Sequence, residues 1–140
     1  MKPIKKIIIP VVAAALILVT MQNCSKGGGG NGGCNETAMS ITTVPANNST
    51  EPISVGPDFT VQVNITANKP TAGVTIEVKA HPVGSTTNFY TSGVVNSTNS
   101  NNSFTITGTP ATVACKVDII VTSKSCATNK FTGGYEYSMK

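Results

Sequence analysis

Apolar and polar residues alternate with a period of two along much of the chain after residue 58. Val61, Val63 and Ile65 alternate with Gln62 and Asn64, which gives this stretch one apolar face and one polar face. An alternation of this kind predicts β-strands in an antiparallel sheet that covers a core on one side. The same pattern recurs at 74–79, 104–107, 115–122 and 131–139.

Residues that favour turns separate these runs, at 68–73, 96–102 and 108–110. Weaker strand signals lie at 37–44, which Pro45 ends, at 53–55 and at 87–91. The total is about seven strands at short spacing, and long helical patterns are missing. We therefore predict an all-β fold, a single antiparallel β-sandwich, with a simple closed barrel as the alternative.

The composition excludes several classes of function. The chain has 140 residues, of which 11% are charged and 5% aromatic, with a single His. All ten basic residues are Lys, so no guanidinium fork is available for phosphate or base edges. From Cys24 onward the chain has seven Lys and six acidic residues, so the net charge of this part is 7 − 6 = +1. We therefore expect no nucleic-acid partner.

The beginning of the chain predicts export. Lys2, Lys5 and Lys6 precede an apolar run at 7–21. Fifteen residues of helix reach about 22 Å, which is short of the roughly 30 Å core of a bilayer. This length is typical of a signal peptide, which we place at residues 1–23. A retained membrane anchor is the alternative.

The sequence Met21-Gln22-Asn23-Cys24-Ser25-Lys26 resembles the cleavage region of a bacterial lipoprotein precursor. In that family a Cys becomes the lipidated N-terminus, so the resemblance implies acylation of Cys24 by chains such as palmitate. Asn23 and Met21 differ from the small and aliphatic residues usual at those positions. An ordinary signal peptide followed by an incidental Cys is the alternative.

Six Gly and one Asn follow at 27–33. A Gly-rich run behaves as a flexible coil, so residues 25–33 would span about 15–18 Å root-mean-square. We interpret residues 24–34 as a lipidated Cys and a flexible tether, and 35–140 as the folded domain. An interdomain linker is the other interpretation of the Gly run, but it has no folded domain before it to connect.

The strand layout at about 36–140 resembles an immunoglobulin-like or fibronectin type III-like domain. The resemblance concerns architecture, because the buried Trp and the tyrosine corner of that class are not found in this sequence. It implies a scaffold and brings no activity with it.

Once Cys24 is assigned to lipid, Cys34, Cys115 and Cys126 remain, so at most one intramolecular disulfide can form. Cys115 lies on the apolar side of its strand and is expected in the core. In an immunoglobulin-like topology the first strand begins at the same end as the last hairpin loop, which favours Cys34–Cys126. A Cys115–Cys126 bond and the absence of any bond are the alternatives.

Catalytic and metal-binding residues are not indicated. His81 precedes Pro82 at a strand end, where we expect an exposed or locally hydrogen-bonded turn residue. Glu77 and Asp118 lie at outward positions, where solvated charge is the default. The Cys residues lack the clustered spacing that tetrahedral zinc requires. We therefore predict no catalytic residues, no metal site and no cofactor.

The expected function is that of a membrane-anchored, non-enzymatic lipoprotein of the bacterial cell envelope, located at the outer membrane. Its immunoglobulin-like domain would bind or space a partner, such as a glycan or another envelope protein. One alternative is a structural subunit that assembles by β-strand addition, as pilus-like fibres do, with the last strand exchanged. A small secreted hydrolase is a third candidate, but it would need a catalytic base.

Overall fold

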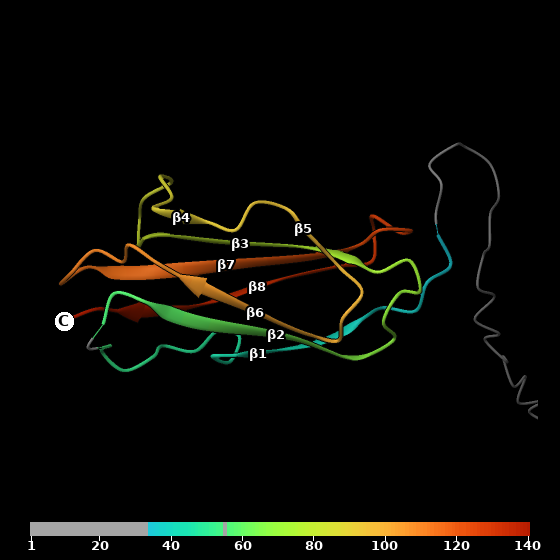
Figure 1. The fold of residues 1–140 in the computed structure, drawn as a ribbon, viewed down its shortest axis with the longest axis horizontal. Helices are drawn as coiled ribbons and strands as arrows, with labels where there is room; N and C mark the ends of the chain where they lie inside the picture. The colour runs from blue at the N-terminus through green and yellow to red at the C-terminus, as the bar shows by residue number, and fades with distance from the viewer. Residues whose placement is uncertain (1–33, 55) are drawn as a thin grey trace, which may run out of the picture. The chain divides into compact units, whose positions relative to one another are not determined.

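The computed structural model describes residues 34–54 and 56–140, and these residues form an all-β domain (Figure 1). They contain eight strands in two antiparallel sheets, one more strand than the seven or so expected. The strands are β1 (Ser40–Val44), β2 (Phe59–Ala67), β3 (Val74–Pro82), β4 (Tyr90–Thr91), β5 (Val95–Ser97), β6 (Asn101–Ile106), β7 (Ala114–Ser123) and β8 (Lys130–Ser138).

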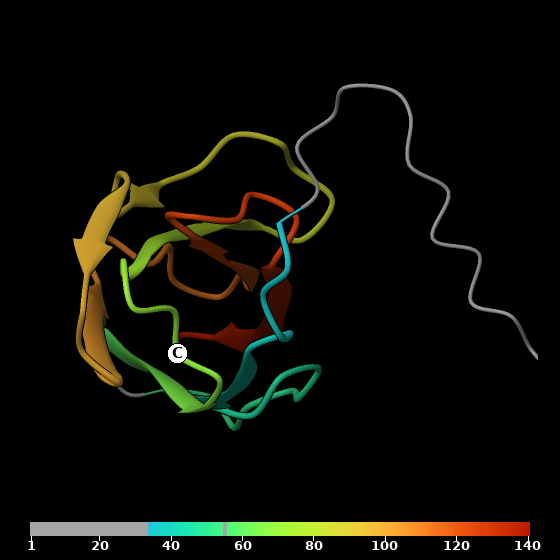
Figure 2. The ribbon, with the colours of Figure 1, turned by 90° about the vertical axis from the view of Figure 1, so that its right-hand side faces the viewer.

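One sheet has the order β1-β2-β6, and the other has the order β4-β3-β7-β8 with β5 also paired to β3. The end-on view in Figure 2 shows β1 and β2 on one side of the domain and β3, β7 and β8 on the other. The β-sandwich prediction is confirmed, and the closed barrel is not the architecture.

The core consists of the apolar residues that the alternation placed on one side of each strand. Val61, Val63, Ile76 and Ile119 are fully buried, and each contributes about 1.5–3 kcal/mol by leaving water. Tyr135 and Tyr137 close the core from β8, and their rings pack with Phe59. The remaining buried members of the core are Ile65, Val74, Val78, Ala80, Ile106, Cys115, Val117 and Val121.

Two local expectations were wrong, and a third was right only in part. The polar segment at 96–102 is not one loop, because Val95–Ser97 and Asn101–Ile106 are strands. Asn is generally disfavoured in strands, but here register with β2 and β3 decides the conformation. The strand expected at 53–55 is a single bridge between Ser54 and Met139, and the strand at 87–91 shrinks to Tyr90–Thr91.

The outer edge of β8 is covered by the segment that connects β1 to β2. The amide of Asn48 donates to the Gly134 carbonyl at 2.7 Å, and the amide of Glu136 donates to the Ser49 carbonyl at 2.9 Å. Further along, the Ser54 amide donates to the Ser138 carbonyl at 2.9 Å. Strand β8 is therefore hydrogen-bonded on both sides, which protects an edge that would otherwise be open to another chain.

The predicted signal peptide at 1–23, the lipidation site at Cys24 and the Gly-rich tether at 27–33 lie outside the described residues. They stay predictions from the sequence. Among the described residues, no helix is long and apolar enough to cross a membrane.

Candidate functional sites

The structure brings Cys34 and Cys126 together as a disulfide pair, with Cα atoms 5.4 Å apart and a sequence separation of 92. Cys34 leads into β1, and Cys126 lies in the loop between β7 and β8. Cys115 sits at the other end of β7, is fully buried and has a free thiol. Burial raises the pKa of that thiol, which keeps it protonated and inert. The expected pairing is confirmed, and Cys115–Cys126 is excluded.

Hydrogen bonds reinforce the disulfide on the segment that leads into β1. The Asn129 side chain donates to Glu36 at 2.9 Å, and its oxygen accepts from the Met39 amide at 3.0 Å. Ser125 also donates to the Glu36 carboxylate, and these hydrogen bonds lower the pKa of Glu36. The disulfide and these contacts together, which we call the N-terminal clip, fasten residues 34–39 to the β7–β8 loop.

His81 is not a turn residue as expected, but lies within β3 opposite Lys116. Its side chain is 14% exposed, and its Nε2 lies 3.1 Å from the Asp118 carboxylate. Its Nδ1 lies 2.9 Å from the Pro82 carbonyl oxygen. The His81 ring thus lies between the Asp118 side chain and the Pro82 backbone, with one ring nitrogen near each.

This arrangement gives His81 a structural role in the folded chain, as a hydrogen-bonding neighbour of Asp118 and Pro82. A general base needs a ring nitrogen directed at the group whose proton it takes, and both nitrogens of His81 are already engaged. The sequence did not reveal the contact because His81 and Asp118 are 37 positions apart and meet only through the β3–β7 register. No cluster of three or more His, Cys, Asp or Glu occurs in the described part of the chain.

His81 belongs to a set of ionisable residues on the outer surface of β3, β7 and β8. Asp118 also pairs with Lys116 at 3.3 Å, and Glu77 pairs with Lys79 at 3.0 Å. We call this set the charged face: Glu77, Lys79, His81, Lys116, Asp118, Lys130 and Glu136.

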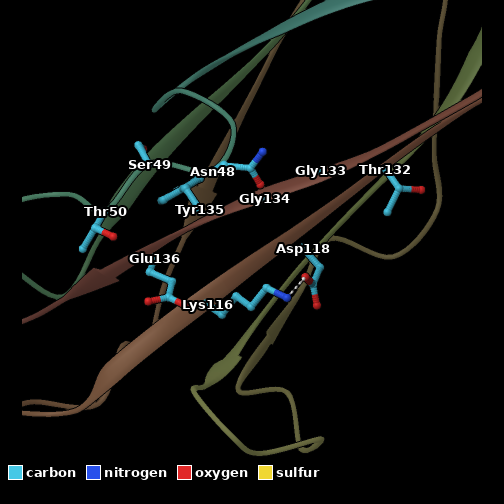
Figure 3. A pocket seen from close by; sticks show the side chains of 10 residues that line it. All are labelled: Asn48, Ser49, Thr50, Lys116, Asp118, Thr132, Gly133, Gly134, Tyr135 and Glu136. Carbon is cyan, nitrogen blue, oxygen red and sulfur yellow. Dashed lines mark ion pairs between the residues drawn. The ribbon is translucent and has the colours of Figure 1, made fainter.

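An open cleft of about 410 Å³ lies between the charged face and the connection after β1 (Figure 3). Gly133 and Gly134 form part of its wall, and the Gly134 amide donates to the Asn47 side chain at 2.8 Å. A Cβ on Gly134 would collide with the Val117 carbonyl oxygen, so the close packing here requires glycine. The cleft is lined by Asn48, Ser49, Thr50, Lys116, Asp118, Thr132, Gly133, Gly134, Tyr135 and Glu136.

The outer surface of the other sheet is different in composition. Strands β1, β2 and β6 present ten side chains on this side, and none of them is ionisable. Nine carry a hydroxyl or an amide, and the tenth is Val44. We call this surface the neutral face: Ser40, Thr42, Val44, Thr60, Gln62, Asn64, Thr66, Asn101, Ser103 and Thr105.

A second open cleft of about 410 Å³ lies on the neutral face, between β2 and β6. Its walls are Gln62, Asn64, Asn101, Asn102 and Ser103. The Asn102 side chain is held by the Ser97 hydroxyl at 2.5 Å and donates to the Asn99 carbonyl at 3.2 Å. The alternation along β2 already placed Gln62 and Asn64 outward, but Asn101 and Asn102 of β6 were assigned to a loop.

Comparisons of the chain with protein-family models, with curated proteins and with solved structures gave no significant match.

Proposed function

We propose that the protein is a non-enzymatic binding domain of the bacterial cell envelope, exported and held at the outer membrane by lipid on Cys24. The N-terminal clip is the observation that carries this proposal. Disulfides form and persist in exported proteins and are rare in the cytosol, so the Cys34–Cys126 pair supports an oxidising compartment. It also supports the assignment of Cys24 to a different role, because the described Cys residues are accounted for without it.

The location of the clip fits an anchored domain. The predicted tether ends at Cys34, which is the residue bonded to the β7–β8 loop. With a tether of about 15–18 Å root-mean-square, the domain would stay close to the membrane surface. The clip keeps the first residues of the domain from separating and lengthening that tether.

The binding role is better supported than assembly by exchange of the last strand. Exchange would withdraw Tyr135 and Tyr137 from the core, where each is about 2% exposed. It would also break the hydrogen bonds that the 48–54 segment makes to β8. Donor-strand assembly normally uses an open edge, and this edge is already paired.

Metabolic labelling with a clickable fatty acid tests the anchor. The wild-type chain should incorporate label and sediment with outer-membrane vesicles. Cys24→Ala should lose the label, whereas the neighbouring Ser25→Ala should keep it. Equal labelling of the wild type and Cys24→Ala, or no label in either, would contradict the proposal.

A further inference from the structure

We propose that the neutral face binds a neutral, hydroxyl-rich polysaccharide, centred on the cleft formed by Gln62, Asn64, Asn101 and Ser103. This inference deepens the proposed function by naming the class of ligand. It relies on that function for the biological setting, while the contact itself rests on the chemistry of the face.

The absence of charge on the neutral face selects among ligand classes. Anionic polymers such as nucleic acids and acidic glycans gain most of their affinity from Lys and Arg contacts to their charges. The outward positions of β1, β2 and β6 offer none. Lipid would need exposed apolar side chains, and Val44 is the single one on this face.

A protein partner is also poorly matched. The residues that dominate protein–protein affinity are buried Trp, Tyr and Arg anchors at the centre of the contact. The neutral face has no aromatic or Arg side chain, since Phe59 and Phe104 point toward the core. Its amides and hydroxyls both donate and accept hydrogen bonds, which is also what a sugar hydroxyl does.

The polar groups of the cleft are available for a ligand. In residues 34–54 and 56–140, the side chains of Gln62, Asn64, Asn101 and Ser103 make no hydrogen bond to the protein, whereas Asn102 is held by Ser97 and Asn99. The cleft therefore presents four side chains whose hydrogen-bonding capacity is open, whereas Asn102, opposite the buried Val63, directs its side chain to the other side of the sheet.

The spacing of these groups suits sugar rings. Gln62 lies opposite Ser103, and Asn64 lies opposite Asn101. Opposite residues are about 5 Å apart across a sheet, and alternate residues are about 7 Å apart along a strand. Four polar groups on such a rectangle are comparable in extent with one sugar ring. Thr42 and the Thr60–Thr105 pair continue the grid, so adjoining sugar units would find further partners.

The test uses the full chain, purified in detergent, and affinity electrophoresis through gels that contain one polysaccharide each. Neutral polymers (dextran, mannan, xylan and mixed-linkage β-glucan) should include at least one that retards the wild type, while alginate and heparin should not. Asn64→Ala combined with Asn101→Ala should weaken that retardation about tenfold, because two hydrogen bonds are lost.

The matched control is Thr75→Ala combined with Thr122→Ala, a cross-strand pair on the outer surface of the other sheet. This variant should bind as the wild type does, and circular dichroism should show both variants folded. Retardation by no neutral polymer would overturn the inference, as would retardation confined to the anionic ones or an Asn64/Asn101 variant that binds normally. A stable dimer that this variant disrupts would also overturn it, since the face would then be a protein interface.

Failure here is distinguishable from failure of the anchor. Acylation at Cys24 without polysaccharide binding would overturn the ligand class alone. Binding without acylation would overturn the anchor alone.

Discussion

The charged face and the neutral face cover opposite sides of one sandwich, and they differ in how their polar groups are satisfied. On the charged face, Asp118 contacts both His81 and Lys116, and Lys79 contacts Glu77. On the neutral face, Gln62 and Asn64 have no such protein partners among the described residues. The side chains of the charged face thus largely contact one another, whereas the side chains of the neutral face have more hydrogen-bonding capacity to offer a ligand.

The largest effect is expected for removal of the Cys34–Cys126 disulfide, which joins the two sheets. Cys34 leads into β1, whose sheet carries the neutral face, and Cys126 lies in the loop between β7 and β8, whose sheet carries the charged face. Replacing both with Ala should lower the free energy of unfolding by about 4–5 kcal/mol in the chain-entropy account, given the 92-residue separation. Urea unfolding measures the loss. Reductant should lower the stability of the wild type and leave the double variant unchanged. A wild-type midpoint in the double variant would show that the two sheets hold together without the bond.

The next prediction compares the cost of a substitution at a closely packed position of β8 with the cost at an exposed position of the neutral face. Gly134→Ala on the charged sheet should cost about 1–3 kcal/mol, because the added Cβ meets the Val117 carbonyl oxygen. Ser103→Ala on the neutral face should stay within about 0.5 kcal/mol. Thermal unfolding of both variants provides the comparison. Equal costs would show that the neutral face is as tightly constrained as the charged sheet.

The core between the two sheets contains two tyrosines, Tyr135 and Tyr137, whose hydroxyls differ in hydrogen bonding. The Tyr137 hydroxyl is 2.8 Å from the Thr109 hydroxyl, so Tyr137→Phe should cost about 1–2 kcal/mol and leave Thr109 without its partner. Among residues 34–54 and 56–140 the buried Tyr135 hydroxyl has no hydrogen-bond partner, so Tyr135→Phe should be neutral or stabilising. Urea unfolding midpoints at neutral pH compare the stabilities of the two variants. A greater loss of stability in Tyr135→Phe than in Tyr137→Phe would show that the Tyr135 hydroxyl has a hydrogen-bond partner in the folded protein.

The same tyrosines predict sensitivity to alkali. Burial raises the pKa of Tyr135 and of Tyr137 above their ordinary value. The stability contributed by the neutral rings is therefore complete below the ordinary pKa of about 10 and is lost as the pH rises beyond it. Tyr135→Phe should reduce this alkaline loss, and unfolding midpoints across that range would detect it. An identical loss in the variant would assign the effect to other groups.

The smallest effect is the contribution of the ion pairs. Asp118→Asn should cost at most about 1 kcal/mol, because the Asp118 side chain is 39% exposed, and the cost should shrink as salt is added. The reciprocal change, Asn64→Asp on the neutral face, should alter stability little and show no comparable salt dependence. Melting temperatures in a salt series test the pair. The same salt response in both variants would remove the distinction between the faces.

The alternation of residue types was enough to predict which side chains enter the core. Successive side chains of a strand point to opposite faces, so in a strand with one covered face the apolar set must be the buried one. Val61, Val63, Cys115 and Tyr137 were all assigned correctly in this way. The Cys34–Cys126 pair needed a topology as well as a pattern, and the strand order expected from the immunoglobulin-like resemblance supplied it.

Features that depend on register between distant strands could not be predicted. The contact between His81 and Asp118 arises because β3 and β7 align with Lys79 opposite Asp118, which brings His81 within diagonal reach. The Asn-rich strand β6 has poor intrinsic preference for its structure and forms against β2. The cleft on the neutral face is formed by β2 and β6. The sequence shows its polar residues, but it does not show that the two strands bring them together.

The N-terminal clip also determines how the domain transmits mechanical load. A pull on the chain before Cys34 reaches the β7–β8 loop directly through the covalent bond at Cys126. Strand β1 has five residues and would be the first element to peel from its neighbour if the backbone alone carried that force. With the bond in place, tension bypasses β1 and enters the long, two-sided β7, which pairs with both β3 and β8. The disulfide therefore carries the load past β1, so that this short edge strand is not the element that a pull on the preceding chain detaches first.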